Sequence, residues 1–279
     1  MRLDEKLDGH SGAYFDGTLI ESRQTAYQLV EVFATPALGK LMRIDGANMV
    51  SERDEFFYHE NLVHPPAVTH PDPRDVLIIG GGDGGTLEEV LKHPGIVRVV
   101  LAELDAGVIA LARAHFHNVH RGAFDDPRVD VRIGDGMAFV RDAGQKFDLI
   151  FLDLTDPLGP AEALYTQAFF ADCKRALHAG GALVLHIGSP YSHPDRVRQS
   201  LASLRKEFRQ VVPWFVHVPM YGATWGFAAA SDTLDPAAMS PAEVNARLAT
   251  RHIGERQYYN GEMHRAMLCI PEYVKPLIS

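Results

Sequence analysis

The chain has 279 residues, of which 46% are hydrophobic and 23% are charged, and its formal net charge is −9. This composition is typical of a globular protein with one large domain, or with one medium and one small domain. The acidic balance argues against nucleic acid and anionic membranes as main partners. The charged start Met1–Lys6 lacks the apolar core of a signal peptide, and no apolar stretch has the length of a membrane span, so we expect a cytoplasmic protein.

Residues 1–50 are predicted to form a small antiparallel β unit of three or four strands. The segments 27–33 and 39–44 are short strand candidates. The dipeptides Asp16-Gly17 and Asp45-Gly46 are typical of tight turns between strands. We expect this unit to be a first domain, residues 1–50, followed by a second domain over residues 51–279.

A helix is predicted to follow the β unit. Ser51 is a suitable N-cap, and the acidic residues just after it are favoured by the helix dipole. Since proline cannot donate a backbone hydrogen bond, we expect this helix to end near His64, before Pro65-Pro66.

From residue 75 onward, short apolar strands alternate with helices. This alternation indicates a parallel sheet covered on both faces. The predicted fold class is therefore α/β, a Rossmann-like, methyltransferase-type, mostly parallel sheet that carries the small N-terminal antiparallel β domain. The predicted strands are 75–79, 97–103, 129–133, 147–153, 181–187, 211–216 and 225–230. The predicted helices are 85–92, 106–116, 135–142, 161–177, 193–208 and 240–250, the last capped by Ser240, and residues 267–270 are expected as a strand or a packed tail.

The first strand of this series runs into Gly80-Gly81-Gly82-Asp83-Gly84-Gly85. Glycines at the carboxyl end of a buried parallel strand let the backbone approach a ligand closely. A carboxylate in such a loop would repel a phosphate, which is the usual ligand of glycine-rich loops. Asp83 therefore indicates a nucleoside ligand that is uncharged or cationic at this point.

Acidic residues also stand at the tips of the next two predicted strands. Glu103 lies eighteen residues after Gly85, a spacing at which a carboxylate accepts both ribose hydroxyls, although it could also cap the next helix. Asp135, beside Gly136, offers a carboxylate to an adenine amino group or serves as the N-cap of the following helix. Together with the glycine loop, these residues form the pattern of an S-adenosyl nucleoside site.

The strand over 147–153 is followed by a second acidic motif, Asp153-Leu154-Thr155-Asp156-Pro157-Leu158-Gly159-Pro160. Asp153 and Asp156 stand at the sheet edge where ligands bind in such folds, while turn formation is the alternative role of Asp156. With Asp83 they would place three carboxylates around one small space, which requires a neutralising cation. No spaced metal-binding motif is present, so we expect an organic amine and no metal. Three histidines are expected on the exposed surface: His115, His117 and His120.

These motifs, in this order, resemble those of the polyamine aminopropyltransferases, the spermidine synthases. The resemblance covers residues 12–274 and rests on the glycine loop and on five further segments. These are 51–60, 153–160, Tyr27-Gln28 with Asp45-Gly46, and Pro219-Met220-Tyr221-Gly222. It implies transfer of the aminopropyl group of decarboxylated S-adenosylmethionine to a diamine, usually putrescine, with no further cofactor. The products would be the longer polyamine and 5′-methylthioadenosine, and the resemblance suggests a homodimer or homotetramer.

Carried over position by position, the resemblance implies a role for each residue of the motifs. Asp83 would hold the amine of the donor, and Asp153 would act as the base. The acceptor site would be lined by Tyr58, His59, Asp156 and Tyr221. The nucleoside would be held by Gln28, Gly80, Gly82, Glu103, Asp135, Gly136 and Pro160.

Three departures from the family pattern lie near the acceptor end. Members often have a tryptophan near the N-terminus, whereas the first tryptophan of this chain is Trp214. Members commonly have glutamine at the position of His186, and a Pro-Thr-Tyr turn where this chain has Pro219-Met220-Tyr221. His186 is expected to be a core residue, and Trp225 a core residue or, as the alternative, a wall of the acceptor pocket. The choice of acceptor among putrescine, cadaverine and spermidine is therefore left open.

Two other functions fit part of the pattern. A class I methyltransferase that uses intact S-adenosylmethionine would need the same nucleoside residues, but Asp83 and the pair Asp153 and Asp156 argue against it. A homologue that only binds nucleosides or polyamines is the second alternative. The joint presence of Tyr58 and the three aspartates argues against the loss of catalysis.

Overall fold

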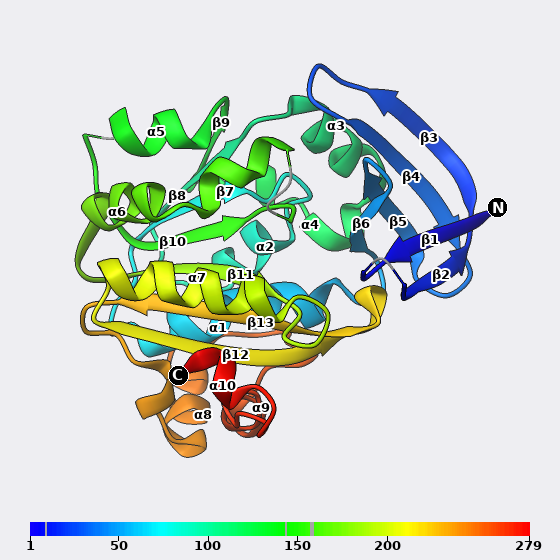
Figure 1. The fold of residues 1–279 in the computed structure, drawn as a ribbon. Helices are drawn as coiled ribbons and strands as arrows, with labels where there is room; N and C mark the ends of the chain where they lie inside the picture. Colours follow the sequence, from blue (N-terminus) through cyan, green and yellow to red (C-terminus); the bar gives the residue numbers. More distant parts are fainter. Residues whose placement is uncertain (9, 143, 157–158) are drawn as a thin grey trace.

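The computed structural model describes residues 1–8, 10–142, 144–156 and 159–279, without the side chains of residues 159 and 160. Its centre is a seven-stranded sheet with the order β12-β13-β11-β10-β7-β8-β9 (Figure 1). The strands of this sheet are β7 (Asp75–Gly80), β8 (Arg98–Glu103), β9 (Val129–Ile133), β10 (Phe147–Asp153), β11 (Leu177–Gly188), β12 (Gln210–Val218) and β13 (Ala223–Ser231).

The pairing within this sheet is mostly parallel. Strand β10 pairs in parallel with β11 and β7, and β8 pairs in parallel with β7 and β9. Strand β13 runs antiparallel to both of its neighbours, β11 and β12. The predicted α/β class with a mostly parallel sheet is confirmed, and each predicted strand of this region lies within about four residues of the observed bounds.

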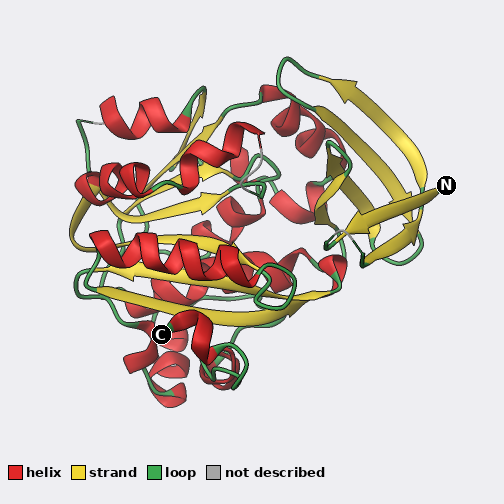
Figure 2. Cartoon of the chain, viewed as in Figure 1, coloured by secondary structure: helices red, strands yellow, loops and turns green. Residues whose placement is uncertain are grey.

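Helices cover both faces of the sheet, as Figure 2 shows. Because successive side chains of a strand point to opposite faces, Val76 and Ile78 pack with α1 to α3 while Leu77 and Ile79 pack with α5 to α7. The helices are α1 (Glu55–Thr69), α2 (Gly85–Leu91), α3 (Ala106–His115), α4 (His117–His120), α5 (Gly136–Asp142), α6 (Gln167–Ala176), α7 (Pro194–Glu207), α8 (Pro241–Thr250), α9 (Gly261–Met267) and α10 (Lys275–Ile278). Short 3₁₀ helices span Ala123–Asp125, Gly159–Tyr165, Pro219–Tyr221 and Pro236–Ala238.

Two antiparallel sheets precede the central one and lie at one end of it (Figure 1). The strands are β1 (Arg2–Lys6) and β2 (Gly12–Asp16) in one sheet, and β3 (Thr18–Gln24), β4 (Leu29–Thr35), β5 (Gly39–Ile44) and β6 (Ala47–Ser51) in the other. Asp45 and Gly46 both have positive φ, as expected of the tight turn between β5 and β6. Asp16-Gly17 does not close a hairpin, because β2 and β3 on its two sides belong to different sheets. The domain boundary at residue 50 stays a prediction.

The helix predicted over residues 51–64 is shifted in the structure. Ser51 ends β6, and α1 begins at Glu55. Pro65 and Pro66 lie inside α1, so the prediction that they end the helix was wrong. Proline at position 65 leaves the carbonyl of Asn61 without its helical donor, but the indole nitrogen of Trp214 donates to this oxygen over 3.0 Å. Tertiary contact thus replaces the hydrogen bond that proline removes.

The C-terminal segment packs against α1. Helix α8 begins with the predicted cap, because Ser240 and Glu243 form a reciprocal capping box. Residues 268–270 follow α9 without forming a strand, and Leu268 and Ile270 are partly buried against the two cores, so the packed tail is the alternative observed. Among the described residues, no helix combines the length and apolarity needed to cross a membrane.

One buried carboxylate attaches this segment to α1. Glu60 is almost fully buried and accepts the backbone N–H groups of Gln257, Tyr258 and Tyr259 at 2.6, 3.0 and 2.7 Å. Backbone donors that lose such a partner inside a protein are costly, because water cannot replace it.

We predict that Glu60→Ala lowers the free energy of unfolding by about 3 kcal/mol, since it leaves one buried and two partly buried N–H groups without their acceptor. Urea titration followed by circular dichroism measures the change. Glu60→Gln keeps one oxygen acceptor and should lose less, and exposed Glu272→Ala is the surface control. A loss for Glu60→Ala no larger than that of the surface control would contradict the role given to Glu60.

Candidate active site

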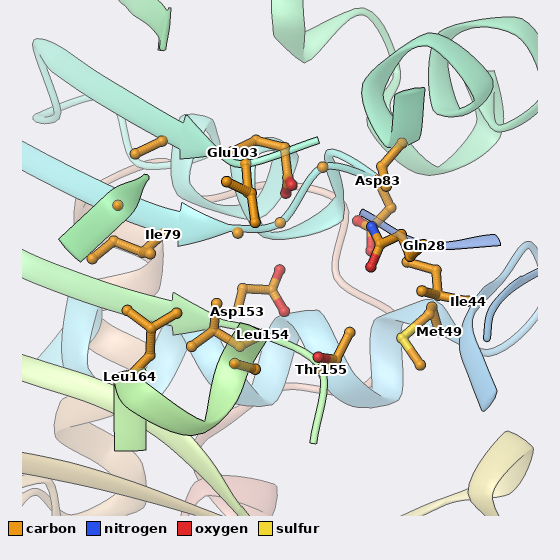
Figure 3. Close-up of a pocket in the computed structure, with 18 of the residues that line it drawn as sticks. Gln28, Ile44, Met49, Ile79, Asp83, Glu103, Asp153, Leu154, Thr155 and Leu164 are labelled. Carbon is orange, nitrogen blue, oxygen red and sulfur yellow. The ribbon is translucent and has the colours of Figure 1, made fainter. Parts of the chain in front are cut away.

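The carboxyl ends of β7, β8 and β10 open into one cavity of about 450 Å³ (Figure 3). The side chains of Glu103 and Asp153 point into this space from two strands, and Gln28 reaches it from the N-terminal sheets. Most of the residues predicted for the site line it: Gln28, Tyr58, His59, Gly80, Gly82, Asp83, Glu103, Asp135, Gly136, Asp153 and Tyr221. Asp156 is not among the described lining residues, and the side chain predicted at Pro160 lies outside the described residues.

The glycine loop is packed directly against the end of β10. Gly80 has φ +80°, and a Cβ built on it would lie 2.1 Å from the backbone oxygen of Asp153. The N–H of Gly81 donates to that same oxygen over 2.8 Å. No residue with a side chain fits at Gly80, for steric and conformational reasons alike. The loop thereby holds Asp83 and Asp153 at the same end of the cavity.

Asp83 occupies the helix start that a phosphate would otherwise use. Its Oδ1 accepts the backbone N–H of Gly85, the first residue of α2, over 2.7 Å. A helix N-terminus attracts anions through such free N–H groups, and here one of them is already satisfied by the protein. This geometry supports the prediction that the loop does not bind a phosphate.

A buried histidine lies beside the two aspartates. His59 Nε2 is 3.6 Å from Asp83 Oδ1, and Nδ1 is 2.7 Å from Glu55 Oε2. One polar atom from each of His59, Asp83 and Asp153 lies within 4.8 Å of the others. Burial by itself lowers the pKa of His59, but the carboxylates of Asp83, Glu55 and Asp153 outweigh it and raise this pKa to about 10. His59 is therefore protonated at neutral pH, and the carboxylate nearest to it is that of Glu55.

Asp153 is the most strongly perturbed acid of this cluster. Burial is the largest cause that raises its pKa to about 6, and the neighbouring charge of Asp83 adds to it. His59 and the hydroxyls of Thr86 and Tyr58 act in the opposite direction. The Oδ2 atom of Asp153 is buried and makes no hydrogen bond to the described residues. A carboxylate with a free oxygen and a pKa in this range is suited to accept a proton.

The other end of the cavity carries the residues predicted for a nucleoside. Glu103 is 8% exposed, and burial raises its pKa to about 7 although the N–H of Asp105 donates to it. Asp105, not Glu103, is the N-cap of α3, so the capping role considered for Glu103 was wrong. Asp135 Oδ1 accepts the N–H of Met137 at the start of α5, and Asp135 also lines the cavity. The two alternatives for Asp135, helix capping and a position at the ligand site, therefore hold together. Gln28 is held at this edge by donating to Asp105 over 3.1 Å.

The end of the cavity near Tyr58 and Tyr221 differs from the prediction. The two rings meet edge to face at 6.5 Å, and Asp54 fixes the turn before Tyr221 by accepting the N–H of Met220 over 2.6 Å. Asp156, which was expected to complete a group of three carboxylates, instead pairs with Arg196 Nη1 at 2.9 Å.

Glu5 of β1 is a residue of this end that the sequence did not single out. Burial raises its pKa to about 7, the N–H of Asn48 donates to it over 2.8 Å, and Asp156 adds to the rise. Burial also raises the pKa of Tyr221, with Asp156 and Glu5 as the next contributors. Glu5 lies in a run of charged residues at the chain start, where no periodicity distinguishes a site residue from a solvated one.

The other histidines considered in the sequence, and Trp225, differ in their burial. His120 is buried against the rings of His117 and Phe124, so its predicted exposure was wrong, whereas His117 is exposed and His115 is partly buried beside Glu21. His186 and Trp225 are core residues as predicted, with rings stacked at 5.8 Å. His186 Nε2 lies 2.6 Å from the hydroxyl of Tyr165.

The sequence of this chain is similar to those of known proteins over most of its length. Residues 55–239 match the model of the spermine/spermidine synthase domain. The polyamine aminopropyltransferase of Nitrosomonas europaea is 48% identical over 99% of this chain and 85% of its own length. That of Pyrobaculum calidifontis is 38% identical over 99% of this chain and 97% of its own.

Solved structures lead to the same family. A spermidine synthase in complex with the transition-state analogue AdoDATO has a TM-score of 0.93 and 34% identity, and the match covers 100% of this chain and 94% of that one. The spermidine synthase of Thermotoga maritima has a TM-score of 0.91 and 33% identity, with the same coverage of both chains. The chain belongs to the spermine/spermidine synthase family and is an enzyme of the polyamine aminopropyltransferase type.

Proposed function

We propose that this enzyme transfers the aminopropyl group of decarboxylated S-adenosylmethionine to putrescine, giving spermidine and 5′-methylthioadenosine. The observation that carries the proposal is the convergence of Asp83 and Asp153 at one end of a cavity whose other end carries Glu103 and Asp135. The acids at the second end suit the ribose and adenine of the donor. The acids at the first end suit its amine and the amine of the acceptor.

Asp83 is assigned to the donor. Loss of the carboxyl group leaves the donor with an ammonium group at this end, which a carboxylate attracts. Intact S-adenosylmethionine would place its own carboxylate near Asp83 and be repelled, which discriminates between the two donors. The cations we assign to this space are the substrate's ammonium groups, with no metal or further cofactor, because the sequence has no spaced metal-binding motif.

Asp153 is assigned to the acceptor. An ammonium group cannot attack carbon until it loses a proton, and the Asp153 oxygen without a hydrogen-bond partner supports Asp153 as the group that takes it. The neutral nitrogen then forms a bond to the carbon next to the sulfonium, the carbon–sulfur bond breaks, and sulfur keeps the electron pair. Because the sulfonium is already a good leaving group, the work of the protein is mainly to align the nitrogen with the carbon–sulfur bond. Tyr58 and Tyr221 are assigned to the walls beside the acceptor chain.

The proposal is tested by supplying decarboxylated or intact S-adenosylmethionine with putrescine, cadaverine, 1,3-diaminopropane, spermidine or agmatine. Mass spectrometry then identifies the products. We expect methylthioadenosine from the decarboxylated donor only, with putrescine as the best acceptor. Formation of S-adenosylhomocysteine from the intact donor would show a methyltransferase instead. Faster turnover with cadaverine or spermidine would reassign the acceptor alone.

We predict that Asp153→Asn lowers kcat roughly a hundredfold or more, because general base catalysis is worth about that factor. The Kd of methylthioadenosine, measured by calorimetry, should change less than about twofold, which is about 0.4 kcal/mol. In the wild type, kcat/KM for putrescine should fall as the pH drops through about 6, where Asp153 of the free enzyme becomes protonated, and this limb should be absent from Asp153→Asn. Unchanged turnover in the variant would remove Asp153 as the base.

A further inference from the structure

A second cation of the protein lies at the acceptor end of the site. Asp156, one of the residues that the family resemblance assigns to the acceptor site, is paired with Arg196 of α7 over 2.9 Å between Oδ1 and Nη1. The Arg196 side chain is only 15% exposed, whereas that of Asp156 is 38% exposed. In this pair the guanidinium side chain is largely buried, whereas the carboxylate side chain is partly exposed.

Arg196 is held in place by its surroundings as well as by Asp156. Its guanidinium lies 5.8 Å from the ring centroid of Tyr165, and Nη2 is 3.5 Å from His186 Nδ1. Burial lowers the pKa of His186 to about 4, and the charge of Arg196 contributes, so this histidine is neutral beside the arginine. A Cβ on Gly188 would lie 3.2 Å from Arg196 Nε, so the glycine leaves room for the side chain. These contacts hold the guanidinium next to Asp156.

The charges near Tyr221 determine how the Asp156–Arg196 pair affects the binding of an acceptor. Asp156 is neutralised by Arg196, and burial keeps Glu5, a further acid near Tyr221, partly protonated near neutral pH, with a pKa of about 7. These two acids would therefore offer a second ammonium group of an acceptor little net negative charge. The ammonium group gains the full attraction of Asp156 only if it replaces Arg196 as the partner.

We propose that Arg196 is a specificity-determining residue, an internal competitor of the acceptor's distal ammonium for Asp156. This inference rests on the proposed function, since it concerns how that site selects its amine. The arginine weakens the binding of diamines, and it makes the enzyme less sensitive to the distal charge of the acceptor than Asp156 alone would.

The first experiment compares Arg196→Gln with the wild type. Calorimetry measures putrescine binding to each enzyme saturated with methylthioadenosine, and steady-state kinetics give KM. We expect Kd and KM for putrescine to fall roughly fivefold, the value of a partly exposed ion pair, while KM for the donor stays within about twofold. Arg198→Gln is the matched control, because Arg198 lies on the same helix, pairs with Asp195 and is exposed. It should change neither constant.

The second experiment tests the competition itself. Asp156→Asn should weaken putrescine binding more in the Arg196→Gln background than in the wild type, because Asp156 is free to bind the amine only there. Arg196→Lys keeps the positive charge and should bind putrescine no more tightly than the wild type, and circular dichroism verifies that each variant is folded.

The outcomes separate the inference from the function on which it rests. Weaker putrescine binding in Arg196→Gln would show that Arg196 orients Asp156 for the acceptor, and unchanged binding would show that the pair does not affect the acceptor; either result overturns the inference. Both results are read from binding, so they are independent of turnover. Absence of methylthioadenosine formation in the wild type would instead overturn the proposed function.

Discussion

The site depends on two carboxylates held close together where water is scarce. Asp83 and Asp153 come from different strand ends, and the charge of Asp83 adds to the burial that raises the pKa of Asp153. The glycine loop makes this proximity possible, because the backbone at Gly80 and Gly81 packs against Asp153 with no side chain between them. The unfavourable charge is only partly relieved inside the protein, by His59, whose own charge is shared with Glu55. The negative charge that remains attracts small cations, and the proposed reaction depends on this attraction.

Other elements keep that end of the cavity in position. Helix α1 carries Tyr58 and His59, and it is anchored at its start by Asp54 to the turn of Tyr221 and further along by Glu60 to the C-terminal segment. The N-terminal sheets also contribute to the site, because Gln28 lines the cavity and the charge of Glu5 acts on Tyr221. The first fifty residues are therefore needed to build the site.

The sequence was sufficient for the features that depend on local pattern. Alternating strands and helices, the turn at Asp45-Gly46 and the cap at Ser240 all follow from neighbouring residues, and they were predicted correctly. Features that depend on distant partners were not. The continuation of α1 through Pro65 requires Trp214, the burial of His120 requires the glycine loop at Gly84, and the pairing of Asp156 requires Arg196 of α7. No spacing along the chain encodes these contacts, because each joins segments brought together only by the fold.

We propose that Asp83 selects a donor that ends in an amine and rejects one that ends in an amino acid. Calorimetry with decarboxylated and intact S-adenosylmethionine, on the wild type and on Asp83→Asn, tests this selection. We predict that the wild type binds the decarboxylated donor at least about a hundredfold more tightly, near 3 kcal/mol. We further predict that Asp83→Asn loses most of this preference, by weaker binding of the decarboxylated donor and stronger binding of the intact one. Equal preference in the two proteins would contradict the account.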